Sequence, residues 1–116
     1  MQFDLSHAAL EIREGRNNAS NLMQMSIAAA QSPLCAHVFS QTFFDKARWA
    51  AAETPATAPL AGLAISVKDL FDTQGSTSSA SSRVLQDAPA AQADAAAVAR
   101  LIAAGAAIIG RTHMVE

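Results

Sequence analysis

The chain has 116 residues and a mass of 12.0 kDa, which is enough for one small domain and too little for two. Eight Lys and Arg against ten Asp and Glu give a net charge of −2, so the clustered positive charge that nucleic-acid binding requires is absent. A single cysteine, Cys35, excludes an internal disulfide and a zinc site built from the cysteines of one chain, and no apolar run reaches the roughly 18 residues of a membrane span.

Alanine dominates the apolar part of the composition: 28 residues are Ala, whereas aromatic residues account for only 5%. Because Ala buries little surface, these residues predict a thin core, and a chain of this size buries only about two-thirds of its unfolded surface. We therefore expect the chain to pack against a partner, a second copy of itself or the remainder of a longer polypeptide.

Two helices are predicted near the start of the chain. Apolar residues at helical spacing indicate a first helix over residues 5–12, and Gly15 follows as a stop signal. Asn17 and Asn18 are suitable caps for a second helix. This helix is expected to end before Pro33, because the residue that precedes a proline resists the α conformation.

Core-forming residues recur in this second helix and in a third one. Met23 and Met25 lie near the apolar face of the second helix, and we interpret them as core-filling residues rather than ligands. A short strand is predicted over residues 36–39, followed by the third helix, which Ser40 or Thr42 would cap. The apolar face of the second helix consists of Ala19, Leu22, Met23, Ile27 and Ala30, and that of the third of Phe43, Phe44, Ala47, Ala50 and Ala51.

The pattern changes after the third helix. Pro55 and Pro59 predict a loop over residues 53–61, which separates a helical region at 1–52 from an α/β region at 62–116. In that second region, alternation of larger apolar residues with small or polar ones predicts a strand over residues 63–67.

A strand–helix–strand unit is expected to complete this second region. Residues 75–82 form a serine-rich loop, and Asp94 is the expected cap of a helix that presents Val98, Leu101 and Ile102 to a sheet. Gly105 ends this helix, and residues 106–109 are expected to form a buried strand parallel to the first. The predicted fold class is therefore α/β, with N-terminal helices followed by the beginning of a mixed β-sheet covered by helices.

Lys68 is the side chain that is the strongest candidate for a catalytic role. It ends the strand predicted over residues 63–67 and lies on the side of Ala64 and Ser66, both small. Burial there would favour a neutral amine, which can act as a general base. The alternative interpretation is structural, because Lys68 and Asp69 can also open a surface turn at the end of the strand.

Other polar residues have simpler interpretations. The serines at 76–82 lack the spacing of a nucleophile motif and are expected to form turns. His7, His37 and His113 stand alone, without the spacing of a metal site. Asp69 and Asp72 are expected to serve in turns and caps. Arg111 is expected to form a weak surface pair with Glu116.

Two blocks of this sequence resemble the amidase signature family. Residues 59–75 run P-L-A-G-L-A-I-S-V-K-D-L-F-D-T-Q-G, and residues 88–116 run A-P-A-A-Q-A-D-A-A-A-V-A-R-L-I-A-A-G-A-A-I-I-G-R-T-H-M-V-E. The paired K-D and D-x-x-G of the first block, and the R-L-x-x-A-G-A and G-[KR]-T of the second, occur in the family's order and register. The chain departs from the family's usual Lys at Arg111, from its Asn at His113 and from its frequent Pro and Gly at Thr77 and Ser81.

The resemblance implies a role for Lys68. In this family the lysine at the matching position is the base of a Ser–cis-Ser–Lys triad. The two triad serines lie in a later Gly- and Ser-rich segment, which would follow Glu116. The resemblance therefore implies that residues 1–116 are the N-terminal part of a single amidase signature domain.

The resemblance also implies an activity and its partners. The complete enzyme is expected to hydrolyse a small-molecule amide without a metal or organic cofactor. Two alternatives remain at this point: the glutaminase subunit of a tRNA amidotransferase, and a non-catalytic α/β interaction module. Expected partners are the amide substrate, the remainder of the chain and a second copy of the chain, with no membrane or nucleic acid. Because the N-terminus lacks a secretory signal, a cytoplasmic location is expected.

Overall fold

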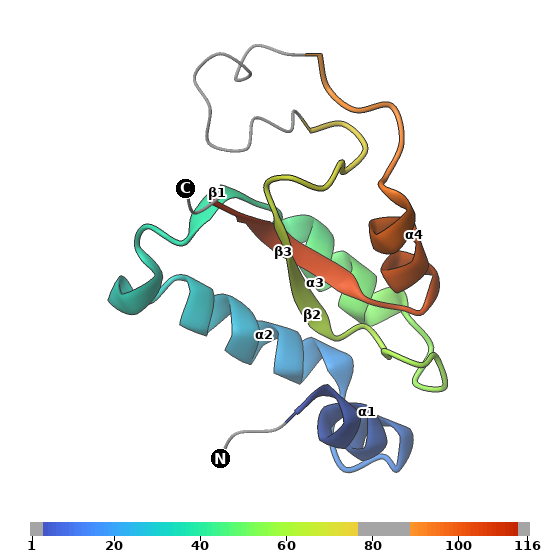
Figure 1. Cartoon of the computed structure of the whole chain (residues 1–116). Coiled ribbons are helices and arrows are strands. Elements are labelled where there is room, and N and C mark those ends of the chain that lie inside the picture. The colour runs from blue at the N-terminus through green and yellow to red at the C-terminus, as the bar shows by residue number, and fades with distance from the viewer. Residues whose placement is uncertain (1–3, 77–88, 114–116) are drawn as a thin grey trace.

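A computed structural model describes residues 4–76 and 89–113. These residues form a mixed sheet packed with helices, which confirms the predicted α/β class (Figure 1). The elements in chain order are α1 (Leu5–Arg13), α2 (Ala19–Ala30), η1 (Pro33–Cys35), β1 (Phe39–Thr42), α3 (Phe44–Glu53), β2 (Ala64–Lys68), α4 (Ala96–Ala103) and β3 (Ala107–Thr112).

The sheet has the strand order β1-β3-β2, with β3 in the middle. β1 is antiparallel to β3, whereas β2 is parallel to it, as the strand–helix–strand pattern predicted. In Figure 1, α1 lies near the start of β2, at the opposite end of the molecule from the end of that strand. The carboxyl end of β2 is therefore remote from α1.

The first two helices begin at local side-chain caps. Asp4 Oδ1 accepts a hydrogen bond from the His7 amide at 2.7 Å, and Asn18 Oδ1 accepts one from the Asn21 amide at 2.8 Å. Asn18 is thus the cap that the sequence predicted. The second helix ends at Ala30. Pro33 begins the 3₁₀ helix η1, a position at which the amide hydrogen that proline lacks has no partner within the helix.

Two expectations for the next elements were wrong. The predicted strand at 36–39 is displaced to Phe39–Thr42, because the turns of η1 continue to the Val38 amide, which donates to the Cys35 carbonyl. Ser40 and Thr42 do not cap α3, since both belong to β1, where Thr42 pairs with Gly110 and Ser40 lies at a shift in the register. The residue at the cap position is Phe43, without a side-chain cap bond.

Asp94 also has a different role from the predicted one. Its Oδ1 accepts a hydrogen bond from the Gln74 amide at 2.7 Å, so it joins the loop after β2 to the segment before α4. The α4 cap position is Ala95, which makes no side-chain cap bond. The predicted apolar face of α4 is only partly covered: Val98 is buried, whereas Leu101 and Ile102 are exposed.

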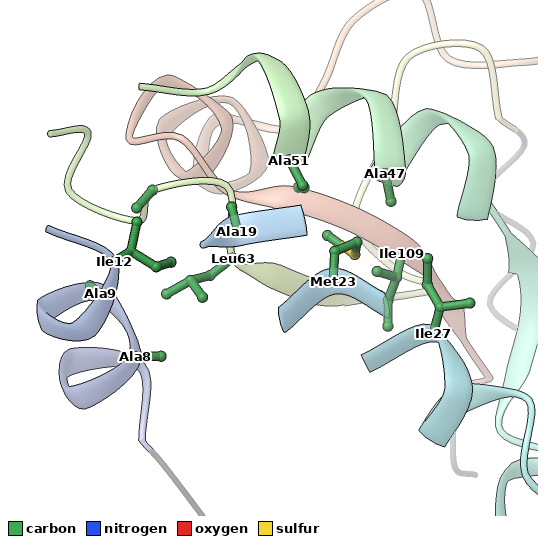
Figure 2. Packing of buried hydrophobic residues seen from close by; sticks show 12 residues of the cluster. Ala8, Ala9, Ile12, Ala19, Met23, Ile27, Ala47, Ala51, Leu63 and Ile109 are labelled. Carbon is green, nitrogen blue, oxygen red and sulfur yellow. The ribbon is translucent and has the colours of Figure 1, made fainter. Parts of the chain in front are cut away.

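The core lies where α1, α2 and α3 meet the sheet (Figure 2). Small side chains let the elements approach closely, and the few larger ones fill the spaces between them. Met23 belongs to this core as predicted, but Met25 is 63% exposed, which corrects its expected core role. The buried members of the cluster are Ala8, Ala9, Ile12, Ala19, Met23, Ile27, Ala47, Ala51, Ala61, Leu63, Ala107 and Ile109.

The two methionines of α2 provide a matched test of this core. Met23 is 1% exposed and Met25 is 63% exposed on the same helix. We expect Met23→Ala to lower the free energy of unfolding by about 2–5 kcal/mol, because it removes transfer energy and leaves a cavity. Met25→Ala should change it by less than about 0.5 kcal/mol. Thermal and urea unfolding of the intact protein measures both, and equal losses would contradict this packing.

Candidate functional site

The candidate site lies at the carboxyl end of β2, where Lys68 is the last residue of the strand. Lys68 pairs with Thr112 of the parallel strand β3, and the Asp69 amide donates to the Thr112 carbonyl at 2.9 Å. The chain then turns, because the amides of Leu70 and Phe71 both donate to the Lys68 carbonyl, at 2.7 and 3.1 Å. The lysine is thus fixed at the junction between a strand and a tight turn.

The burial expected for Lys68 refers to a larger sheet packed against further segments, and it stays a prediction. The position of Lys68 at the end of a strand in a mixed sheet is as predicted, but its side chain is exposed. The alternation of the strand puts Lys68 on the side of Ala64 and Ser66, while Val67 on the other side is buried. The described residues cover the start of this face, at half-buried Ala64, and leave its end open to solvent.

A buried ion pair lies directly next to the lysine. Arg111 Nη2 is 2.8 Å from Asp69 Oδ1, and the two residues are only 1% and 4% exposed. The same nitrogen donates a hydrogen bond to the Phe71 carbonyl at 3.0 Å. Arg111 therefore contacts both the residue after Lys68 and the turn that follows it.

This pair replaces one sequence-based expectation. Asp69 lies in the turn after β2, as expected. Arg111, however, was expected to form a surface pair with Glu116, which lies outside the described residues. Instead, the parallel pairing of Val67 with Arg111 brings the Asp69 and Arg111 side chains together. The signal for this contact was available: opposite charges stand at the ends of two apolar strands in one parallel strand–helix–strand unit. Periodicity alone does not give their register, and the register decides the contact.

The loop after the site is tied to the segment that leads into α4. The Gly75 amide donates to the Ala91 carbonyl at 2.8 Å, and the Ala91 amide donates to the Ser76 carbonyl at 3.0 Å. Ser76 is buried in this arrangement. The other serines of the predicted loop, at 77–82, lie outside the described residues.

A pocket of about 240 Å³ lies between α3, this loop and α4. Thr73 and Ile108 line it, together with the more exposed Lys46. Lys68 does not line this pocket, so the pocket and the candidate lysine are separate features.

The histidines are dispersed, as the sequence indicated. His7 is in α1, His37 lies between η1 and β1, and His113 follows β3. Within residues 4–76 and 89–113, no group of three or more His, Cys, Asp or Glu side chains is arranged to hold a metal ion. In the same ranges, no helix has the length and hydropathy needed to cross a membrane.

Known proteins share both the sequence and the fold of this chain. A model of the amidase family matches residues 21–116. AtzE, the 1-carboxybiuret hydrolase subunit of Pseudomonas sp. (strain ADP), is 50% identical over 58 residues, which are 50% of this chain and 13% of that protein. The A subunit of glutamyl-tRNA(Gln) amidotransferase from Symbiobacterium thermophilum is 35% identical over 109 residues, which are 94% of this chain and 22% of that protein.

A solved structure has the same arrangement of elements. It is the inhibitor-bound form of a vestigial protein complex related to the evolutionary origins of an s-triazine catabolic enzyme. Its TM-score is 0.87 at 32% identity, over 98% of this chain and 27% of that chain. The chain therefore belongs to the amidase signature family, and it spans about a quarter or less of the length of these three proteins.

The buried ion pair is expected to contribute strongly to stability. Asp69→Ala leaves the Arg111 guanidinium buried without its carboxylate, which should lower the free energy of unfolding of the intact protein by about 3–5 kcal/mol. Glu14→Ala is the control, because the Arg16–Glu14 pair has the same 2.8 Å separation with both side chains about half exposed. This control should lose less than about 1 kcal/mol. Denaturant unfolding compares the two, and similar losses would show that burial of the Asp69 pair has no effect.

Proposed function

We propose that this chain is the N-terminal part of an amide hydrolase in which Lys68 is the general base of a Ser–cis-Ser–Lys triad. The observation that carries the proposal is the place of Lys68 in an amidase family chain. It ends a strand of a mixed sheet, is exposed on that strand's small-residue side and is anchored by a buried ion pair at the next residue. In parallel sheets the carboxyl ends of strands are the usual place for catalytic groups.

The proposed reaction is an acyl transfer to water. The neutral Lys68 amine takes a proton from the bridging serine, which takes one from the nucleophilic serine. The nucleophile attacks the amide carbonyl, an acyl-enzyme forms, and ammonia or an amine leaves with a proton. Water then attacks the acyl-enzyme and releases the acid. In this proposal a segment that follows Glu116 supplies both serines, and every proton moves between protein side chains, substrate and water.

The exposed surface supports the proposal that more chain packs here. Leu70 and Phe71, next to Lys68, are 45% and 39% exposed, and the apolar residues Leu101 and Ile102 of α4 are also exposed. Leu70 and Phe71 lie beside the candidate site, and exposed large apolar side chains are typical of surfaces that another segment covers. We propose that residues 1–116 belong to a single domain whose remaining part covers Lys68 and brings the serines to it.

A second candidate function is the glutaminase subunit of a tRNA amidotransferase. The similarity to the A subunit of glutamyl-tRNA(Gln) amidotransferase covers 94% of this chain, which favours it. AtzE supports a hydrolase of small molecules with 50% identity over 58 residues, an identity that the A subunit of Burkholderia thailandensis also reaches over 58 residues. Assay of ammonia release from glutamine and from a panel of small amides separates the two. Activity on glutamine that depends on partner subunits and charged tRNA would establish the second candidate.

The two lysines of the chain allow a direct test of the proposed base. In the full-length protein, Lys68→Ala should lower kcat by about 10²–10⁴-fold, because it removes the group that accepts the proton. Lys46→Ala is the control, since Lys46 lies on the surface of α3, and it should leave kcat unchanged. Steady-state ammonia release measures both variants, and a Lys68→Ala enzyme within twofold of wild type would refute the role.

The 116-residue segment alone should release no ammonia from amides, because the proposed nucleophile is not part of it. The purified segment is incubated with a panel of small amides, and the Lys68→Ala segment serves as the background. Turnover above that background would place the nucleophile within residues 1–116. It would overturn the assignment of both serines to a later segment.

A further inference from the structure

The turn after Lys68 has little apolar packing of its own. Its residues Leu70 and Phe71 are 45% and 39% exposed, and their amides donate to the Lys68 carbonyl. Local bonds at the surface hold a turn less firmly than a strand is held in its sheet. Contacts from other elements therefore decide how well this turn keeps Lys68 in one orientation.

Arg111 reaches the turn from inside the sheet. Its Nη2 lies 2.8 Å from Asp69 Oδ1 and donates to the Phe71 carbonyl at 3.0 Å, so one nitrogen contacts both sides of the turn. Arg111 is itself held firmly: it is 1% exposed, and its backbone pairs with strands on both sides, at Val67 and Gln41. The rigid middle strand of the sheet is thereby connected to the turn.

We propose that Arg111 is a positioning residue for Lys68, acting through Asp69 and the Phe71 carbonyl. This inference rests on the proposed function, because it gives Arg111 a purpose only if Lys68 is the base. A general base must lie within hydrogen-bond distance of the proton that it accepts. A displacement of about 1 Å at a catalytic group can cost about 10²-fold in rate.

The main test removes both charges at once. In the full-length enzyme, Asp69→Asn with Arg111→Met leaves no buried charge without a partner, so this double variant should fold where a single one could fail. We expect kcat to fall about 10–100-fold while KM stays within twofold of wild type, because the turn loses its anchor and the substrate contacts do not. The single variant Arg111→Lys leaves Asp69 unchanged and keeps a cation beside it. Its kcat should therefore be much closer to that of wild type than the kcat of the double variant.

A second measurement separates positioning from a general structural effect. The Asp69→Asn and Arg111→Met changes are also introduced into the Lys68→Ala enzyme, where they should cause no further loss, because a positioning residue acts only through the lysine. Full wild-type kcat in the double variant, or an additive loss in the Lys68→Ala background, would overturn the inference. Wild-type activity of Lys68→Ala itself would instead refute the proposed function, so the two failures are distinguishable.

Discussion

The contact between Asp69 and Arg111 joins the ends of the two parallel strands, and the geometry of the candidate site depends on it. Both side chains are removed from water, so their attraction is strong, but so is the cost of removing either one alone. Arg is better suited than Lys to this place, because its planar guanidinium can bond a carboxylate and a carbonyl together. The chain has Arg at this position where the family usually has Lys, and the structure shows a contact that uses the larger group.

The alanine-rich core makes this contact geometrically achievable. Helices that present Ala47 and Ala51 can lie close to the sheet, and Met23 and Ile27 fill the remaining space. Gly110 likewise allows a close approach between strands, because a Cβ on this residue of β3 would be 2.6 Å from the Gln41 carbonyl oxygen of β1. Gly105 has a φ of +99°, and a Cβ there would be 2.9 Å from the Ala58 Cβ. Glycine at this position lets the chain turn from the end of α4 into β3. Small residues thus let the neighbouring elements approach β3, the strand that carries Arg111, closely.

The sequence predicted the local features well and most long-range contacts poorly. The Asn18 cap and the end of α2 before Pro33 follow from residue types close together in the chain. The parallel pairing of β2 with β3 is a long-range feature that follows from the strand–helix–strand order. Asp94 was misassigned because its partner, the Gln74 amide, is 20 residues away and competes with the local cap. The buried state of Arg111 was missed for the same reason, since a charged side chain is interpreted as exposed until its partner is known.

The exposure of Lys68 has a different cause, and it constrains the proposed enzyme. The end of the small-residue side of β2 is open, while the turn below it is anchored from the inside by Arg111. A base that is rigidly attached on one side and uncovered on the other is suited to a site completed by a second segment of chain. That segment must bring two serines and exclude water, because a lysine amine in open solvent is mostly protonated at neutral pH. The exposed Leu70 and Phe71 offer that segment an apolar surface to pack against. The packing step that completes the fold would therefore also remove Lys68 from water.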